Sequence, residues 1–310
     1  MPRFADMLTS HRSETVVPQL TTQLMIWQDR FMTSSQEATP VEDTAYFRRI
    51  KPIEMTEDVR TSYFVSTQHA QGAWQEDELH MAPVSGLVAA ELEAYQPRND
   101  FITTRISFDI LGKLHAGEVK VVTETVRPGR TIELIQSTVY AQGRAVLVGR
   151  TWKVIASDTS RVAELTDAQL PPVEEAEPWD GMPDRWPGGF IRSIQTRTFP
   201  DHAPGHGRAW ISSDIDMIEG EPTSSFVRLI GLADTANGLA PLAEPTSGDV
   251  FFANVDLTIH FLREPIGEWL GLSIAANIGQ TGGGITSAIL YDTDGVLGRS
   301  EQSQTVRITQ

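Results

Sequence analysis

The sequence predicts an α+β fold made of two similar halves, in each of which an antiparallel sheet wraps around a central helix. Segments 101–154 and 251–308 present the same features in the same order, at one constant offset. Such a uniform register indicates an internal duplication. Each half also shows a short hairpin, one helix and then four strands. The glycine landmarks that match between the halves are Gly117 with Gly267 and Gly129 with Gly279.

The first half begins with a predicted hairpin, formed by Tyr46-Phe47 and by the alternating run 61–67. A helix is predicted over 77–95, because its apolar residues share one face and Pro97 follows its end. Four strands are then predicted over 101–111, 118–127, 131–142 and 144–155, with glycine-containing turns between them.

The second half repeats this order. A hairpin is predicted from 190–199 and 207–216, and a helix over 224–239. Ser224 or Ser225 would cap that helix, and Gly238 with Pro241 would stop it. The predicted strands are 250–262, 268–278, 283–291 and 296–308.

These elements predict four regions. Residues 1–44 form an N-terminal extension, 45–156 the first domain, 157–189 a connector and 190–310 the second domain. The connector is acidic and contains five prolines, so it is not expected to join a regular sheet.

Composition excludes several function classes. The formal charge of -16 disfavours nucleic acids and anionic membranes as partners. With no cysteine, thiolate chemistry and Cys-ligated metals are excluded. The charged N-terminus offers no signal peptide, so a cytoplasmic protein is expected. The uncharged run 269–291 holds polar residues and glycines, which indicates buried strands and no membrane insertion.

Four motifs carry a resemblance to a known family. They are ELHMAPVSGLVAAELE, GLADTANGLAP, ANVDLTIHFLREPIGEWL and DGVLGRSEQSQTVR. Their order and spacing over residues 45–310 resemble the acyl-CoA thioesterase II type family. That resemblance implies a double hotdog fold, with two curled antiparallel sheets each wrapped around a central helix. It also implies an acyl-CoA substrate, a role in fatty acid metabolism, and no cofactor.

The family hydrolyses a thioester with a water held by an Asp, a Ser or Thr, and a Gln. By the resemblance, the Asp falls on Asp234 and the Gln on Gln302. The middle position falls on Asn254, which departs from the pattern because an amide cannot relay a proton as a hydroxyl does. This departure leaves efficient hydrolysis in question.

The residues themselves support Asp234 as a general base. A thioester carbonyl is electrophilic enough for attack by a water that a carboxylate deprotonates. A carboxylate in a buried helix needs polar partners, which Asn254 and Gln302 could supply. In the alternative interpretation, Asp234 bonds to Thr235 or Asn237 and only shapes the helix.

Comparison of the halves predicts a single site. If Gly86 matches Gly231, Ala89 stands in the place of Asp234. When the strands of the two halves are aligned, Thr104 corresponds to Asn254 and Trp152 corresponds to Gln302. The first half is therefore predicted to be a degenerate scaffold without an active site, which could also form part of the acyl pocket.

Substrate contacts are predicted from Arg263 and Arg299 for the CoA moiety, and from Gly231. Arg307 is a third cationic candidate, and for each of these arginines the favoured alternative is an ordinary surface ion pair with one of the many carboxylates. His80 is expected to cap or pack against the first helix. His202 and His206 lack carboxylates at ligand spacing, so no metal is predicted.

Three functions are weighed. The leading one is an acyl-CoA thioesterase. A hotdog hydratase would need a histidine five residues after Asp234, where Leu239 stands. The third is a non-catalytic acyl or acyl-CoA binding protein with a decayed site. Association into a homo-oligomer is left open.

Overall fold

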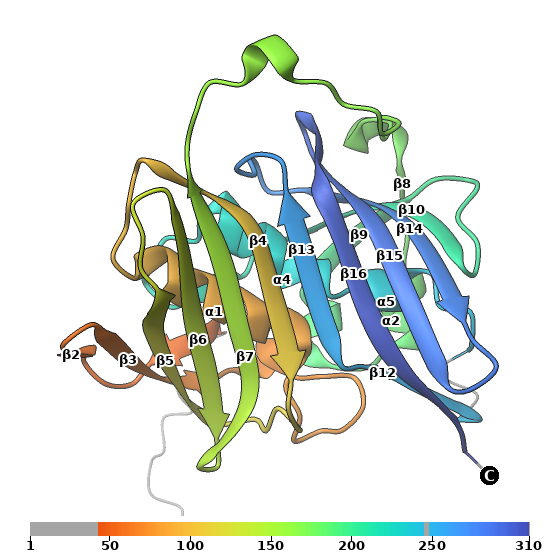
Figure 1. Cartoon of the computed structure of the whole chain (residues 1–310). Helices are drawn as coiled ribbons and strands as arrows, with labels where there is room; N and C mark the ends of the chain where they lie inside the picture. The colour runs from red at the N-terminus through yellow and green to blue at the C-terminus, as the bar shows by residue number, and fades with distance from the viewer. Residues whose placement is uncertain (1–42, 245–247, 310) are drawn as a thin grey trace, which may run out of the picture. The chain divides into compact units, whose positions relative to one another are not determined.

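The first half forms a hairpin, a helix and four strands, as predicted (Figure 1). The computed structural model describes residues 43–244 and 248–309, so the predicted extension 1–44 lies almost wholly outside the described residues. The elements are β1 (Ala45–Arg49), β2 (Glu54–Thr56), β3 (Val59–Ser66), α1 (Met81–Ala94), β4 (Phe101–Ile110), β5 (Glu118–Arg127), β6 (Ile132–Ala141) and β7 (Arg144–Ile155).

The second half follows the same order after a connector with little regular structure. The elements are β8 (Glu177–Pro178), α2 (Gly181–Arg185), α3 (Gly189–Arg192), β9 (Ile194–Thr198), β10 (His206–Ser213), β11 (Asp216–Ile218), α4 (Ser225–Ala233), α5 (Ala236–Leu239), β12 (Val250–Asn254), β13 (Asp256–Phe261), β14 (Leu270–Ile278), β15 (Gly283–Asp292) and β16 (Gly295–Ile308). Short 3-10 turns cover Gln68–Ala70, Ser160–Val162 and Val173–Glu175.

The strands form one continuous sheet, not the two separate sheets that were predicted. Over the described residues the sheet has sixteen strands, in the order β11-β1-β3-β5-β6-β7-β4-β13-β16-β15-β14-β10-β9-β8, with β2 beside β3 and β12 beside β16. The halves join where β4 pairs antiparallel with β13, with Ser107 opposite Thr258. The two predicted sheets are joined because each half has an edge strand with unpaired backbone groups, and these groups pair with the edge strand of the other half.

The duplication is visible in the turns and in the strand order. Gly117 and Gly267 precede corresponding strands and both have positive φ, 108° and 73°. This left-handed region suits glycine, so the matching landmarks mark turns that need that residue. Strand order in the first half, β1-β3-β5-β6-β7-β4, mirrors β9-β10-β14-β15-β16-β13 in the second.

The connector contributes to the sheet, contrary to the prediction. Glu177 and Pro178 pair with β9 at the edge of the sheet. An edge strand tolerates proline because one of its sides needs no N–H donor. The predicted strand from residue 190 starts only at Ile194, since Gly189–Arg192 form α3. Trp186 is buried in the main core, so the connector packs against the body, as expected.

Both long helices are buried between the sheet and each other. Eleven of the fourteen residues of α1 are buried, which fits a helix that is apolar or small on nearly all sides. The helices touch at Gly86 and Gly231: a Cβ added to Gly86 would lie 3.0 Å from the Cα of Gly231. The matching glycines of the two halves therefore let the helix backbones approach closely. No helix of the described residues is long and apolar enough to cross a membrane.

Two predicted elements are interrupted near the candidate site. The helix predicted to reach Leu239 breaks after Ala233, where the Thr235 hydroxyl donates to the carbonyl of Leu232 at 2.6 Å. The strand predicted over 250–262 breaks at Val255, whose carbonyl accepts the N–H of Ile110 at 3.0 Å. A one-residue irregularity of this kind redirects the neighbouring side chains.

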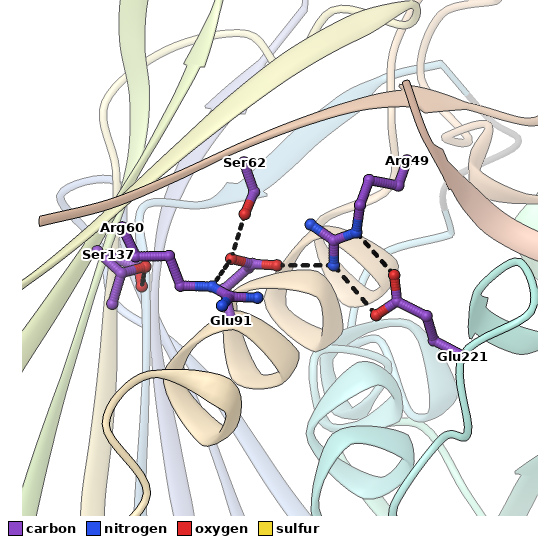
Figure 2. A network of polar contacts seen from close by, with 7 residues as sticks. Arg49, Arg60, Ser62, Glu91, Ser137 and Glu221 are labelled. Atoms are coloured by element: carbon purple, nitrogen blue, oxygen red, sulfur yellow. Dashed lines mark hydrogen bonds and ion pairs between the residues drawn. The ribbon is translucent and has the colours of Figure 1, made fainter. Parts of the chain in front are cut away.

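A buried ion-pair network ties the first half to the second (Figure 2). Glu91 of α1 is 1% exposed and accepts from Arg60 at 2.8 Å, from Ser62 at 2.7 Å and from Arg49 at 3.2 Å. Arg49 also makes a forked pair with Glu221 of the second half, at 2.7 and 3.0 Å. Each oxygen of the buried carboxylate is thereby partnered.

Replacement of Glu91 by alanine is expected to lower the free energy of unfolding by about 3–5 kcal/mol, because it leaves two arginines without their buried partner. Urea denaturation measures this. Glu124→Ala, at an exposed position of β5, is the control and should cost less than about 1 kcal/mol. Equal losses in the two variants would contradict a structural role for the network.

Candidate active site

A cavity of about 260 Å³ lies where the start of α1 meets the end of α4. Residues from both halves and from the connector line it. The apolar side chains include Leu79, Met81, Ile110, Leu114, Met182 and Trp186, and the polar ones include His80, Lys113, Asp234, Asn237 and Asn254. An apolar pocket with a few convergent polar groups is the usual form of a small-molecule site.

Aromatic rings form one wall of this cavity. Trp74 of the first half and Trp186 of the connector both line it, with ring centroids 5.2 Å apart. Phe252 of β12 backs both rings, at 5.9 and 5.8 Å. The wall therefore combines residues from three separate parts of the chain.

Asp234 is the buried acid of the cavity. It follows the last residue of α4 and is 6% exposed. Burial raises its pKa from 3.8 to about 6, against hydrogen bonds from Asn254 and Gln302 that lower it. A carboxylate whose pKa lies this close to neutral pH is suited to accept and return a proton.

Two amides hold one oxygen of this carboxylate and leave the other free. Oδ1 accepts from Asn254 Nδ2 at 2.8 Å and from Gln302 Nε2 at 3.0 Å. Gln302 also donates to the backbone carbonyl of Asp234 at 3.1 Å. Oδ2 accepts no hydrogen bond from the described residues. Its nearest charged or titratable neighbour is His80, whose Nδ1 lies 3.5 Å away.

The orientation of Asn254 follows from its other contact. Its Oδ1 accepts from Asn237 Nδ2 at 3.0 Å, and Gln304 in turn donates to Asn237. The Asn254 nitrogen must therefore face Asp234 as a donor. The alternative partners considered for Asp234 are engaged elsewhere, since the Thr235 hydroxyl bonds to Leu232 and Asn237 bonds to Asn254.

The structure thus brings together Asp234, Asn254 and Gln302, which the sequence had placed on separate elements. Only Asp234 and Asn254 line the cavity; Gln302 is 1% exposed and lies behind the carboxylate. In the described residues, no group of three or more His, Cys, Asp or Glu side chains is arranged to hold a metal ion.

Family comparisons match both halves. Residues 70–154 match the acyl-CoA thioesterase N-terminal domain, and residues 167–306 match the acyl-CoA thioesterase C-terminal domain. The chain belongs to the acyl-CoA thioesterase II type of double hotdog proteins. No curated protein matches it in sequence.

Solved structures agree in fold with this double hotdog protein. A hot dog fold protein of unknown function from Alicyclobacillus acidocaldarius shares 13% identity at a TM-score of 0.64, over 84% of this chain and 97% of that one. An acyl-CoA thioesterase II from Mycobacterium marinum shares 13% at 0.59, over 84% and 96%. The dehydratase domain from the CurJ module of curacin polyketide synthase shares 12% at 0.55, over 84% and 97%.

The three predicted substrate contacts of this double hotdog protein lie outside the cavity. Arg263 makes a forked ion pair with Asp292, with both distances 2.5 Å. Arg299 pairs with Asp167. Gly231 packs against Gly86 between the helices. All three positions therefore serve packing or ion pairing in this structure.

His80 is the cavity residue whose place the sequence did not indicate. It caps α1 as expected, since its Nδ1 accepts the N–H of Ala82 at 3.1 Å. Its ring lies 4.4 Å from that of Phe190, and burial lowers its pKa to about 3. The sequence signals the cap, but it does not show that this end of α1 meets the end of α4.

Asp234→Asn is expected to stabilise the protein at high pH. The folded state holds the Asp234 proton more tightly than the unfolded state does. The protonated carboxyl group therefore contributes stability that is fully present below pH 3.8 and is lost as the pH rises through about 6. The asparagine variant avoids this cost and should be more stable at pH 8 by roughly 1–3 kcal/mol.

Unfolding by denaturant at pH 8 and at pH 4 measures that difference, which should shrink at the lower pH. Asp109→Asn, at an exposed position of β4, serves as the control. A difference between parent and Asp234→Asn that does not change with pH would contradict the raised pKa.

Proposed function

We propose that the protein hydrolyses an acyl-CoA thioester, with water as the nucleophile and Asp234 as the general base. The observation that supports this most is the asymmetry of the carboxylate. Two amides hold Oδ1, whereas Oδ2 has no donor among the described residues, and Asp234 lines a mainly apolar cavity. A water placed beside Oδ2 would meet an acceptor that is held in one orientation.

The reaction divides into two proton transfers. The water oxygen bonds to the thioester carbonyl carbon while Oδ2 takes one of its protons, which gives a tetrahedral oxyanion. Collapse of this intermediate breaks the carbon–sulfur bond, and the proton passes from Asp234 to the departing sulfur. The products are a carboxylic acid and the CoA thiol. A general base of this kind contributes roughly 10²–10⁴-fold in rate.

Asn254 and Gln302 act in this scheme as positioning residues. Both direct an N–H to Oδ1, and so they orient the carboxylate and favour its charged form. Neither amide relays a proton. Asn254, which stands where the family has a hydroxyl residue, therefore cannot relay a proton but still donates a hydrogen bond to Asp234.

The cavity suits the acyl part of the substrate. Its walls are mainly apolar, and the paired rings of Trp74 and Trp186 form part of them. Lys113, which pairs with Asp77 at 2.5 Å, is the cationic side chain among the described lining residues. It replaces Arg263 and Arg299 as the candidate contact for the anionic CoA moiety.

Asp234→Asn is expected to lower kcat by roughly 10²–10⁴-fold, because the amide cannot accept the water proton. Release of CoA thiol from acyl-CoA substrates measures this. In the parent, kcat/KM should rise with pH through about 6 and then level off, since only the ionised carboxylate is a base.

Asp109→Asn is the matched control and should retain the activity of the parent. Turnover by Asp234→Asn equal to that of the parent would remove the carboxylate from the mechanism. Tight acyl-CoA binding without turnover in the parent would favour a non-catalytic acyl-CoA binding protein. The observation that favours this second function is Asn254, which has no hydroxyl for proton relay.

Trp74→Ala is expected to shift the preference toward longer acyl groups. The indole lines the cavity and is 39% exposed, so its removal enlarges the space available to an acyl chain. For chains too long for the parent, kcat/KM should rise about tenfold or more relative to shorter chains. Trp152→Ala, outside the cavity on β7, is the control. An unchanged length profile in Trp74→Ala would show that the acyl group lies elsewhere.

A further inference from the structure

His80 is held in a single tautomer by its capping contact. Its Nδ1 accepts the backbone N–H of Ala82 at 3.1 Å, so Nδ1 carries no proton. In a neutral imidazole the proton then resides on Nε2, which is a donor. Burial keeps the ring neutral, because it lowers the pKa to about 3.

The Nε2–H group has no partner among residues 43–244 and 248–309. The side chain is only 17% exposed. Even so, Nε2 is not one of the fully buried polar atoms that lack a hydrogen bond, so it remains accessible. The ring lines the cavity and is supported on one face by Phe190. A fixed, neutral donor is thereby available at the cavity surface.

This donor lies beside the proposed general base. Nδ1 of His80 is 3.5 Å from Asp234 Oδ2, and Nε2 is separated from Nδ1 by a single ring carbon. A water on Oδ2 and a carbonyl oxygen on Nε2–H would be neighbours. In thioester hydrolysis these are the attacking group and the oxygen that becomes negative.

We propose that His80 donates its Nε2–H to the thioester carbonyl oxygen and stabilises the oxyanion, so that the two halves build the active site jointly. This assignment rests on the proposed hydrolysis. It gives the first half a catalytic residue, where the sequence predicted a scaffold that could line the acyl pocket. No proton leaves the histidine, because a neutral donor serves both the ground state and the oxyanion.

Two substitutions separate the capping role from the catalytic one. In His80→Asn the amide oxygen takes the place of Nδ1 and caps α1, since asparagine is a preferred N-cap residue, but the donor at Nε2 is lost. In His80→Gln the longer amide places an N–H near the position of Nε2, and the cap is weakened.

His80→Asn is expected to lower kcat by about 10²–10³-fold with little change in KM or in thermal unfolding. His80→Gln should retain more of kcat while unfolding at a lower temperature. Parental kcat in His80→Asn would overturn the proposal. So would a loss of kcat that follows stability in both variants, since that is the result of a purely structural role.

A second measurement does not depend on turnover. In the Asp234→Asn background, acyl-CoA labelled with ¹³C at the thioester carbonyl should show a lower infrared carbonyl stretch when bound. Addition of His80→Asn should abolish that shift. A bound ligand with the same stretch in both backgrounds would overturn the His80 contact, even if hydrolysis is established.

The two proposals can also fail separately in the other direction. If the infrared shift depends on His80 but the parent protein does not hydrolyse the ligand, the proposed thioesterase activity is wrong and the proposed hydrogen bond from His80 is supported. If acyl-CoA does not bind at all, both proposals are wrong.

Discussion

The contact between Gly86 and Gly231 decides where the functional groups of this protein meet. Without side chains at these positions the two helices approach closely, and they run in opposite directions. At one end the Ser224 hydroxyl donates to Glu93 at 2.9 and 3.0 Å, and at the other His80 lies 3.5 Å from Asp234. A bulkier residue at the crossing would separate both pairs, so the cavity depends on two glycines that do not line it.

The acid of the cavity is balanced between opposing effects. Loss of hydration favours its neutral form, whereas two amide donors favour the charged form. The nearby N-terminus of α1 also favours a negative charge, since the backbone N–H groups of a helix start carry partial positive charge. The lone pair of His80 Nδ1 is engaged by Ala82 and offers Asp234 no proton. The resulting pKa of about 6 leaves the carboxylate basic and mostly ionised at neutral pH.

The sequence was sufficient for the parts of the site that depend on local pattern and repeat register. The resemblance to the thioesterase motifs predicted that Asp234, Asn254 and Gln302 would meet, and the structure brings their side chains together. The halves themselves followed from landmarks such as Gly117 and Gly267.

What escaped prediction depends on contacts between distant segments. The pairing of β4 with β13 joins two sheets into one, and no local pattern marks it. The sequence predicts that His80 caps the first helix, but its position beside Asp234 follows only from the antiparallel crossing of the two helices. Arg263 was assigned to the substrate by charge, but a forked pair with Asp292 satisfies that charge within the fold.

The two halves use a buried carboxylate in opposite ways. In the first half, Ala89 stands at the position of Asp234, and the acid lies two residues further on, at Glu91. Donors from Arg49, Arg60 and Ser62 engage both of its oxygens. In the second half neutral amides partner only one oxygen of Asp234. Two arginines make the first acid a structural link between elements, whereas the second acid is held by neutral donors and keeps one oxygen to which no described residue donates.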